Sequence, residues 1–182
     1  PSYRLMEDVY QVYEEEFSVD WVRCIRQNSD MTEREREEFL EEFQSREGTL
    51  VGFCVLGGIF SEGVDLIGES LIGAIIVGTG LPQIGSEREI LKEYYDRKKQ
   101  SGFDYAYRYP GMNKVLQAAG RVIRTREDHG VILLLDERFR QREYSNLFPV
   151  EWNDRKTCTL SNVEVQLQKF WESIPDKISH KL

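Results

Sequence analysis

The sequence predicts an α/β domain built on a mainly parallel sheet with helices on both faces. Short apolar runs alternate along the chain with amphipathic helical patterns, and such uninterrupted runs are typical of strands buried on both sides of a parallel sheet. A length of 182 residues with 40% hydrophobic residues suffices for a substantial core, and indicates one domain or one domain with an appendage. In parallel sheets, ligands bind where the strands end.

Two helical patterns flank a strand in the first part of the chain. Residues 4–16 carry apolar side chains at helical spacing, and Ser2 is suited to cap the start of this helix. Residues 21–26 alternate apolar and basic side chains, which predicts a short strand. Thr32 and Glu35 have the spacing of a capping box and predict the start of a second helix, whose glutamates form a solvated face.

Two core strands and a charged helix follow. The apolar runs 50–56 and 71–77 predict buried strands, and the loop 57–65 leaves the end of the first. Residues 86–100 predict a helix capped by Ser86.

The last part of the chain contains a helix, a strand and a terminal helix. We expect residues 101–111 to be irregular, with three tyrosines that either pack together or stack on bases. A helix is predicted over 112–125, a core strand over 130–135, and a final helix over 162–172.

The most informative stretch lies at the end of the helix predicted over 112–125. At about 100° per residue, Gln117, Arg121 and Arg124 would share one narrow helical face. Two arginines in register on a rigid element are suited to grip phosphate oxygens. The same pattern also fits a solvated basic face on an amphipathic helix, and the rest of the sequence has to decide between the two interpretations.

The charge distribution agrees with a phosphate ligand although the net charge of -8 does not. Residues 1–50 contain 14 acidic and 6 basic side chains, so the remainder of the chain is neutral overall. Within residues 108–126 there are five basic side chains and no acidic one. Three cysteines without a CxxC spacing favour reduced thiols, and hence the cytoplasm, over disulfides or a zinc site. We predict no metal ligands in this chain. We also predict no membrane partner, since no apolar run approaches the roughly 20 residues that a membrane-spanning helix needs.

A glycine-rich loop resembles a phosphate-binding loop only superficially. Gly58 and Gly63 have the GxxxxG spacing, but Val64 and Asp65 occupy the positions where such a loop needs lysine and serine or threonine. Without that lysine the loop does not cradle β- and γ-phosphates in the usual way. The sequence thus contains features of half a nucleotide pocket.

Three stretches resemble motifs of the superfamily 2 helicases. Residues 117–124, Gln-Ala-Ala-Gly-Arg-Val-Ile-Arg, resemble the QxxGRxxR pattern of motif VI, and Asp-Glu-Arg-Phe at 136–139 narrows the resemblance to the XPD/DinG branch. Residues 60–65, Phe-Ser-Glu-Gly-Val-Asp, resemble motif V of the same branch, and residues 1–3 resemble the end of motif IV. The resemblance therefore extends from residue 1 to about residue 140.

This resemblance implies a fold and explains what the chain lacks. Residues 1–145 are expected to form the second RecA-like domain of a DNA helicase, and residues 146–182 an extension whose final helix packs on it. In this family the Walker A lysine, the DEAH-type motif and any iron–sulfur cysteines belong to the first RecA-like domain. That domain makes most of the contacts to ATP and Mg²⁺. Since this sequence begins after the motif IV strand, we expect an open sheet edge. Since the lysine and the metal ligands belong to the first domain, we expect no ATPase from the chain alone.

The resemblance also implies roles for residues of motif VI. Arg124 is expected to be the arginine finger on the γ-phosphate of ATP, with Arg121 beside it. Gln117 is expected to orient the phosphate or the attacking water, and Gly120 belongs to the same nucleotide-facing motif.

Two further groups of residues are implied at the domain cleft and on single-stranded DNA. The residues expected to link the nucleotide state to the DNA-binding surface are Glu62, Gly63 and Asp65. The residues expected to hold DNA phosphates are Ser2, Tyr3, Gly57 and Gly58. Two alternatives stay open: the motor half of a translocase or helicase–nuclease, and a nucleic-acid-binding or regulatory module without catalysis.

Overall fold

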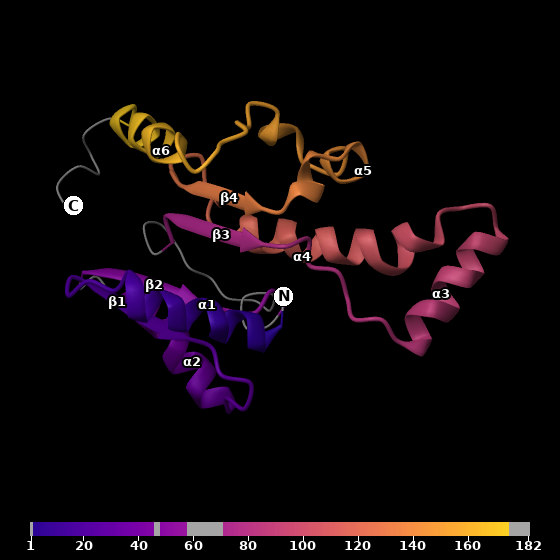
Figure 1. Cartoon of the computed structure of the whole chain (residues 1–182), viewed down its shortest axis with the longest axis horizontal. Coiled ribbons are helices and arrows are strands. Elements are labelled where there is room, and N and C mark those ends of the chain that lie inside the picture. Colours follow the sequence, from indigo (N-terminus) through magenta and orange to yellow (C-terminus); the bar gives the residue numbers. More distant parts are fainter. Residues whose placement is uncertain (1, 46–47, 58–70, 175–182) are drawn as a thin grey trace. The chain divides into compact units, whose positions relative to one another are not determined.

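The computed structural model describes residues 2–45, 48–57 and 71–174, and the chain divides into two compact units, residues 1–146 and 147–182. In the first unit the helices and strands are α1 (Tyr3–Glu16), β1 (Val22–Arg26), α2 (Glu33–Glu41), β2 (Thr49–Phe53), β3 (Gly73–Val77), α3 (Ser86–Arg97), α4 (Tyr109–Ala119), β4 (Val131–Leu135) and α5 (Arg142–Ser145) (Figure 1). The second unit contains the 3₁₀ turn Val150–Trp152 and α6 (Val163–Glu172).

The strands pair in parallel, as the sequence predicts. β1 pairs with β2 in a register that places Val22 opposite Thr49, and β3 pairs with β4 with Gly73 opposite Val131. Among the described residues the strands form two sheets of two strands each.

The β1–β2 pair is covered on both faces, because successive side chains of a strand point to opposite sides. On one face, Tyr10 and Tyr13 of α1 pack on Phe53 with ring centroids 5.2 and 5.5 Å apart. On the other face, Phe43 follows α2 and packs over Gly52, where a Cβ atom would overlap its ring. This is the predicted three-layer arrangement.

The caps of the first two helices confirm the sequence prediction. The Ser2 hydroxyl oxygen accepts a hydrogen bond from the Leu5 N–H at 3.3 Å. At the start of α2, Thr32 and Glu35 form both hydrogen bonds of a capping box. The cap predicted at Ser86 is wrong, because Ser86 is the first residue of α3 and the N-cap is Gly85, which is extended and whose carbonyl oxygen accepts from the Glu89 N–H at 3.0 Å.

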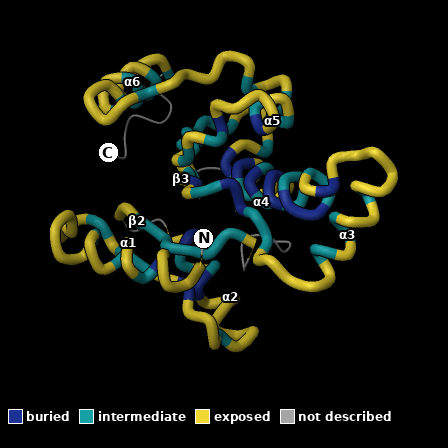
Figure 2. Tube along the Cα trace, turned by 45° about the vertical axis from the view of Figure 1, so that its right-hand side comes forward, coloured by how far each residue is buried: buried dark blue, intermediate teal, exposed yellow. Residues whose placement is uncertain are grey.

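The chain is helical from residue 102 into α4, so the prediction of residues 101–111 as an irregular segment is wrong. A π-helical turn spans Asp104–Arg108 and runs directly into α4, which contains Pro110 near its start. The tyrosines pack on one another, with Tyr95 stacked on Tyr105 at 4.0 Å. Buried positions are concentrated along α4, whereas α6 has none (Figure 2).

The second unit is small and has its own aromatic contacts. Phe148 packs on Trp152 with ring centroids 5.2 Å apart, and the Lys156 ammonium donates to Gln166 of α6 at 3.1 Å. Packing of α6 on the first unit stays a prediction. None of the helices in the described ranges is long and apolar enough to cross a membrane.

Candidate functional site

The helix that carries Gln117 ends earlier than the sequence predicts. α4 stops at Ala119, and the N–H groups of Arg121 and Val122 donate to the carbonyls of Ala118 and Ala119 in a tighter turn. Gln117 therefore lies on α4, whereas both arginines lie in the segment 120–130, which we call the arginine loop. The prediction that all three share one helical face is wrong.

The physical reason is a carboxylate that competes with the helix. The N–H groups of Arg124 and Thr125 donate to Oδ2 of Asp128, at 2.9 and 2.8 Å. These donors would bond to carbonyl oxygens four residues earlier if the helix continued. Asp side chains commonly offer the backbone such an alternative to helix, so the chain turns at this point.

Both ends of the arginine loop are fixed by packing. Val122 has only 2% of its surface exposed. Gly130 lies against it so closely that a Cβ atom would overlap the Val122 Cγ1 methyl and lie 2.9 Å from the Ile72 carbonyl oxygen. The next residue, Val131, donates its N–H to that carbonyl at 3.0 Å. The loop therefore leaves the core at one end and enters β4 at the other.

The predicted site residues at the end of α4 and in the arginine loop differ in exposure. Gln117 and Gly120 are exposed, whereas Arg121 and Arg124 are half-buried. The carboxylate of Asp128 has a pKa below its usual range because the backbone N–H groups of Thr125 and Arg124 stabilise its charged form. Asp128 is therefore ionised at neutral pH. A half-buried guanidinium on a fixed loop suits binding of phosphate oxygens.

A second acid–arginine pair follows β4. Asp136 accepts from the Arg138 N–H and Nε at 2.9 Å and from its Nη2 at 2.6 Å. The Arg138 side chain lowers the pKa of Asp136 through these hydrogen bonds. Because its guanidinium is held by this carboxylate, Arg138 fixes the turn after β4.

The predicted DNA contacts at the N-terminus are engaged within the protein. Ser2 caps α1, and the Tyr3 hydroxyl accepts from Gln27 Nε2 at 2.9 Å. Gln27 is only 4% exposed, and its Oε1 accepts from the Val55 N–H at 3.0 Å. It therefore ties α1 to the segment after β2, beside a shallow hollow of about 290 Å³.

Gly57 is placed beside a cation that the sequence did not assign to the site. Its φ is +92°, a conformation that favours glycine. The Lys114 side chain of α4 lies 3.0 Å from the position that a Cβ atom would occupy. The other predicted residues of this part, Gly58, Glu62, Gly63 and Asp65, lie outside the described residues.

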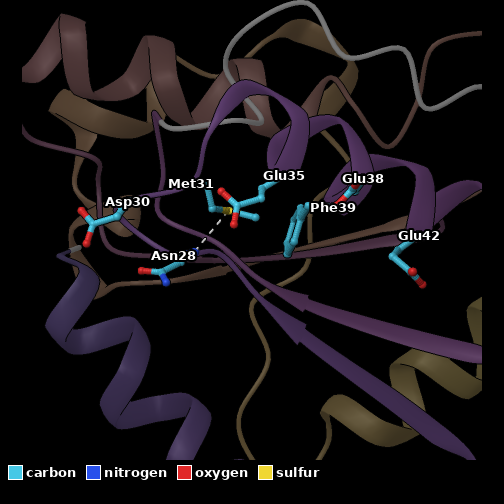
Figure 3. A pocket seen from close by; sticks show the side chains of 7 residues that line it. All are labelled: Asn28, Asp30, Met31, Glu35, Glu38, Phe39 and Glu42. Carbon is cyan, nitrogen blue, oxygen red and sulfur yellow. Dashed lines mark hydrogen bonds between the residues drawn. The ribbon is translucent and has the colours of Figure 1, made fainter.

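The other hollow of note is acidic. A volume of about 320 Å³ is lined mainly by residues of α2 and the turn before it, and Figure 3 shows the side chains of Glu35, Glu38 and Glu42 around it. Carboxylates disfavour phosphate, so this hollow is not a candidate for nucleotide or nucleic acid.

The family model of the helicase C-terminal domain matches residues 1–155. This chain belongs to the helicase C-terminal domain family. The match confirms the resemblance to XPD-like helicases that motifs V and VI predict.

Known proteins support the same assignment. The regulator of telomere elongation helicase 1 homolog of Drosophila melanogaster is 32% identical over 149 residues, which cover 75% of this chain and 15% of that protein. The homolog of Caenorhabditis briggsae is 31% identical over 131 residues, 65% of this chain and 13% of that protein. This helicase C-terminal domain thus spans about one seventh of these relatives' length.

A solved structure confirms the fold. An XPD helicase superposes with a TM-score of 0.60 at 21% identity, covering 80% of this chain and 25% of that one. The α/β fold predicted as RecA-like is therefore confirmed.

Sequence reasoning missed three residues of this helicase domain that the structure brings to the predicted sites: Gln27, Lys114 and Asp128. The Asp-x-Gly spacing of Asp128 and Gly130 is typical of a turn and indicates Asp128, and Lys114 lies within the basic stretch 108–126.

Proposed function

We propose that this domain is the second RecA-like motor domain of an ATP-dependent DNA helicase of the XPD/DinG type. The observation that carries the proposal is the arginine loop, in which Arg121 and Arg124 stand on a segment fixed at both ends and closed by Asp128. A first RecA-like domain would complete the ATP site.

In this proposal the arginines act on the γ-phosphate. Hydrolysis spreads charge over the γ-phosphoryl oxygens, and a guanidinium that is already in place stabilises that charge without reorganisation. Arg124 is the finger, Arg121 lies beside it, and Gln117 orients the attacking water. Gly120 ends α4 without a side chain that would obstruct approach.

The metal belongs with the partner domain. Among the described residues no group of three or more His, Cys, Asp or Glu side chains suits a metal ion. In this proposal the chain contributes the cationic half of the site. Mg²⁺ would be held with ATP mainly by the first domain, and any iron–sulfur cluster would belong to other parts of the protein.

Single-stranded DNA is the proposed polymer substrate. Because Ser2 and Tyr3 already have partners in the protein, we assign the phosphate contact to the backbone around Gly57 and Gly58 with Lys114 beside it. Glu62, Gly63 and Asp65 would couple this contact to the ATP site.

The test is steady-state ATP hydrolysis by a protein that carries both RecA-like domains. Arg124→Ala should lower kcat by about 10³–10⁵-fold, the range found for arginine fingers, while ATP binding is largely retained. Arg126→Ala is the matched control, since Arg126 is an exposed arginine of the same loop. Near-normal turnover by Arg124→Ala would refute the finger role.

A further inference from the structure

Asp128 organises the middle of the arginine loop through a single atom. Its Oδ2 accepts from the N–H of Arg124 at 2.9 Å and from the N–H of Thr125 at 2.8 Å. The Thr125 hydroxyl oxygen in turn accepts from the Glu127 N–H at 3.3 Å. The turn over residues 124–128 is thus closed from within.

These hydrogen bonds act on the residue whose side chain matters most in the proposed function. Holding the Arg124 N–H restricts the backbone from which its guanidinium projects. Val122, two residues earlier, is in the core, and Gly130, two residues after Asp128, abuts Ile72. With both ends packed, the Asp128 carboxylate adds two hydrogen bonds in the middle of the loop.

We propose that Asp128 is a positioning residue for catalysis, which holds Arg124 in the geometry needed at the γ-phosphate. This inference rests on the proposed function. Misplacement of a catalytic group by about 1 Å can lower a rate by about 10²-fold, so loss of the two hydrogen bonds is enough to affect turnover.

The role depends on the acceptor oxygen more than on the negative charge. Both N–H groups bond to the same oxygen atom, and an asparagine at this position has one amide oxygen that can accept both. The backbone hydrogen bonds are also the largest causes of the lowered pKa of Asp128, ahead of the charge of Arg124. Asparagine should therefore substitute for the aspartate, whereas alanine should not.

The experiment measures kcat and KM for ATP in the protein that carries both RecA-like domains. We expect Asp128→Ala to lower kcat by about 10²-fold with little change in KM, and Asp128→Asn to retain most of the activity. Glu127→Ala is the matched control, since Glu127 is an exposed acidic residue directly before Asp128, and it should behave as the native protein. Native kcat in Asp128→Ala, or equal loss in Asp128→Asn, would overturn the proposal.

Amide hydrogen exchange separates a local role from loss of folding. In the 182-residue chain, Asp128→Ala should speed exchange at Arg124 and Thr125 while the amides of β4 keep their protection. Unchanged exchange at both positions would contradict the role of Asp128. If Arg124→Ala hydrolyses ATP normally, the proposed function fails; if Arg124→Ala is inactive and Asp128→Ala is normal, only this inference fails.

Discussion

Val122 and Gly130 provide a sharp test of how the arginine loop is anchored. A Cβ atom on Gly130 would overlap the Val122 Cγ1 methyl and lie 2.9 Å from the Ile72 carbonyl oxygen. Gly130 is not among the glycines with positive φ, so Gly130→Ala would be unfavourable through contact and not through backbone strain. Overpacking of this kind costs about 1–3 kcal/mol of folding free energy.

The reverse change at Val122 creates the missing space. Val122 is 2% exposed, and Val122→Ala removes two buried methyl groups at about 0.8 kcal/mol each, plus a cavity contribution, for a total of about 2 kcal/mol. In the double variant the new methyl at position 130 enters the space vacated by Cγ1. We therefore expect the double variant to be more stable than the sum of the single effects by about 1–2 kcal/mol.

Urea unfolding of the 182-residue chain measures the free energies of unfolding of the native protein, the two single variants and the double variant. The four can be compared directly where their m-values are equal. Gly73→Ala is the matched control: it makes the same chemical change in β3, where the nearest atom to a Cβ would be the Val131 carbonyl oxygen at an ordinary 3.7 Å. This control should be neutral or stabilising. Additivity of Val122→Ala and Gly130→Ala within about 0.5 kcal/mol would refute the proposed direct contact.

Two further predictions concern Asp136 and Lys114. The Arg138 side chain lowers the pKa of Asp136 below its ordinary 3.8. The pair therefore stabilises the fold above about pH 3.8, and this stabilisation is lost as the pH falls through the lower pKa that Asp136 has in the folded protein. Urea unfolding between pH 6 and 3, compared with Asp136→Asn, should show a shallower acid dependence in the variant; parallel curves would contradict the pairing. Lys114→Gln should weaken single-stranded DNA binding and reduce the slope of log K against log salt concentration by about 0.7. Lys98→Gln, at the end of α3, is the control and should change neither quantity. An unchanged slope for Lys114→Gln would exclude the contact.

Local patterns predicted the parts of the fold that depend on neighbouring residues. The capping box of Thr32 and Glu35 involves residues three apart, and both of its hydrogen bonds are present. The parallel strands follow from continuous apolar runs, which need burial on both faces wherever the sheet is placed.

The wrong predictions arose where a tertiary contact overrides a local pattern. Pro110 and Gly111 form a dipeptide typical of a turn. They nevertheless lie within α4, and Tyr109 before them donates its N–H to the Asp104 carbonyl oxygen of the π-helical turn. Gly111 is needed for close packing, since a Cβ atom there would lie 2.6 Å from the Thr79 carbonyl oxygen. No helical periodicity distinguishes such a glycine from one in a loop.

The end of α4 illustrates the same limit at the candidate site. Residues 117–124 have helical spacing, but α4 ends at Ala119, and the carboxylate of Asp128, beyond that window, accepts from the N–H groups of Arg124 and Thr125. The roles of these residues stay a prediction, and their placement on a loop could not be predicted from the sequence.

This placement links the arginines to the core by a short path. Leu71 packs against the cluster of Phe39 and Phe43 over β2. The carbonyl oxygen of the next residue, Ile72, accepts a hydrogen bond from the Val131 N–H at the end of the arginine loop. Packed interiors transmit displacement because they contain few voids. If Arg124 has the proposed catalytic role, substitutions in this core should alter turnover by moving Arg124 as well as by lowering stability. Activity should therefore be compared between variants whose free energies of unfolding are known.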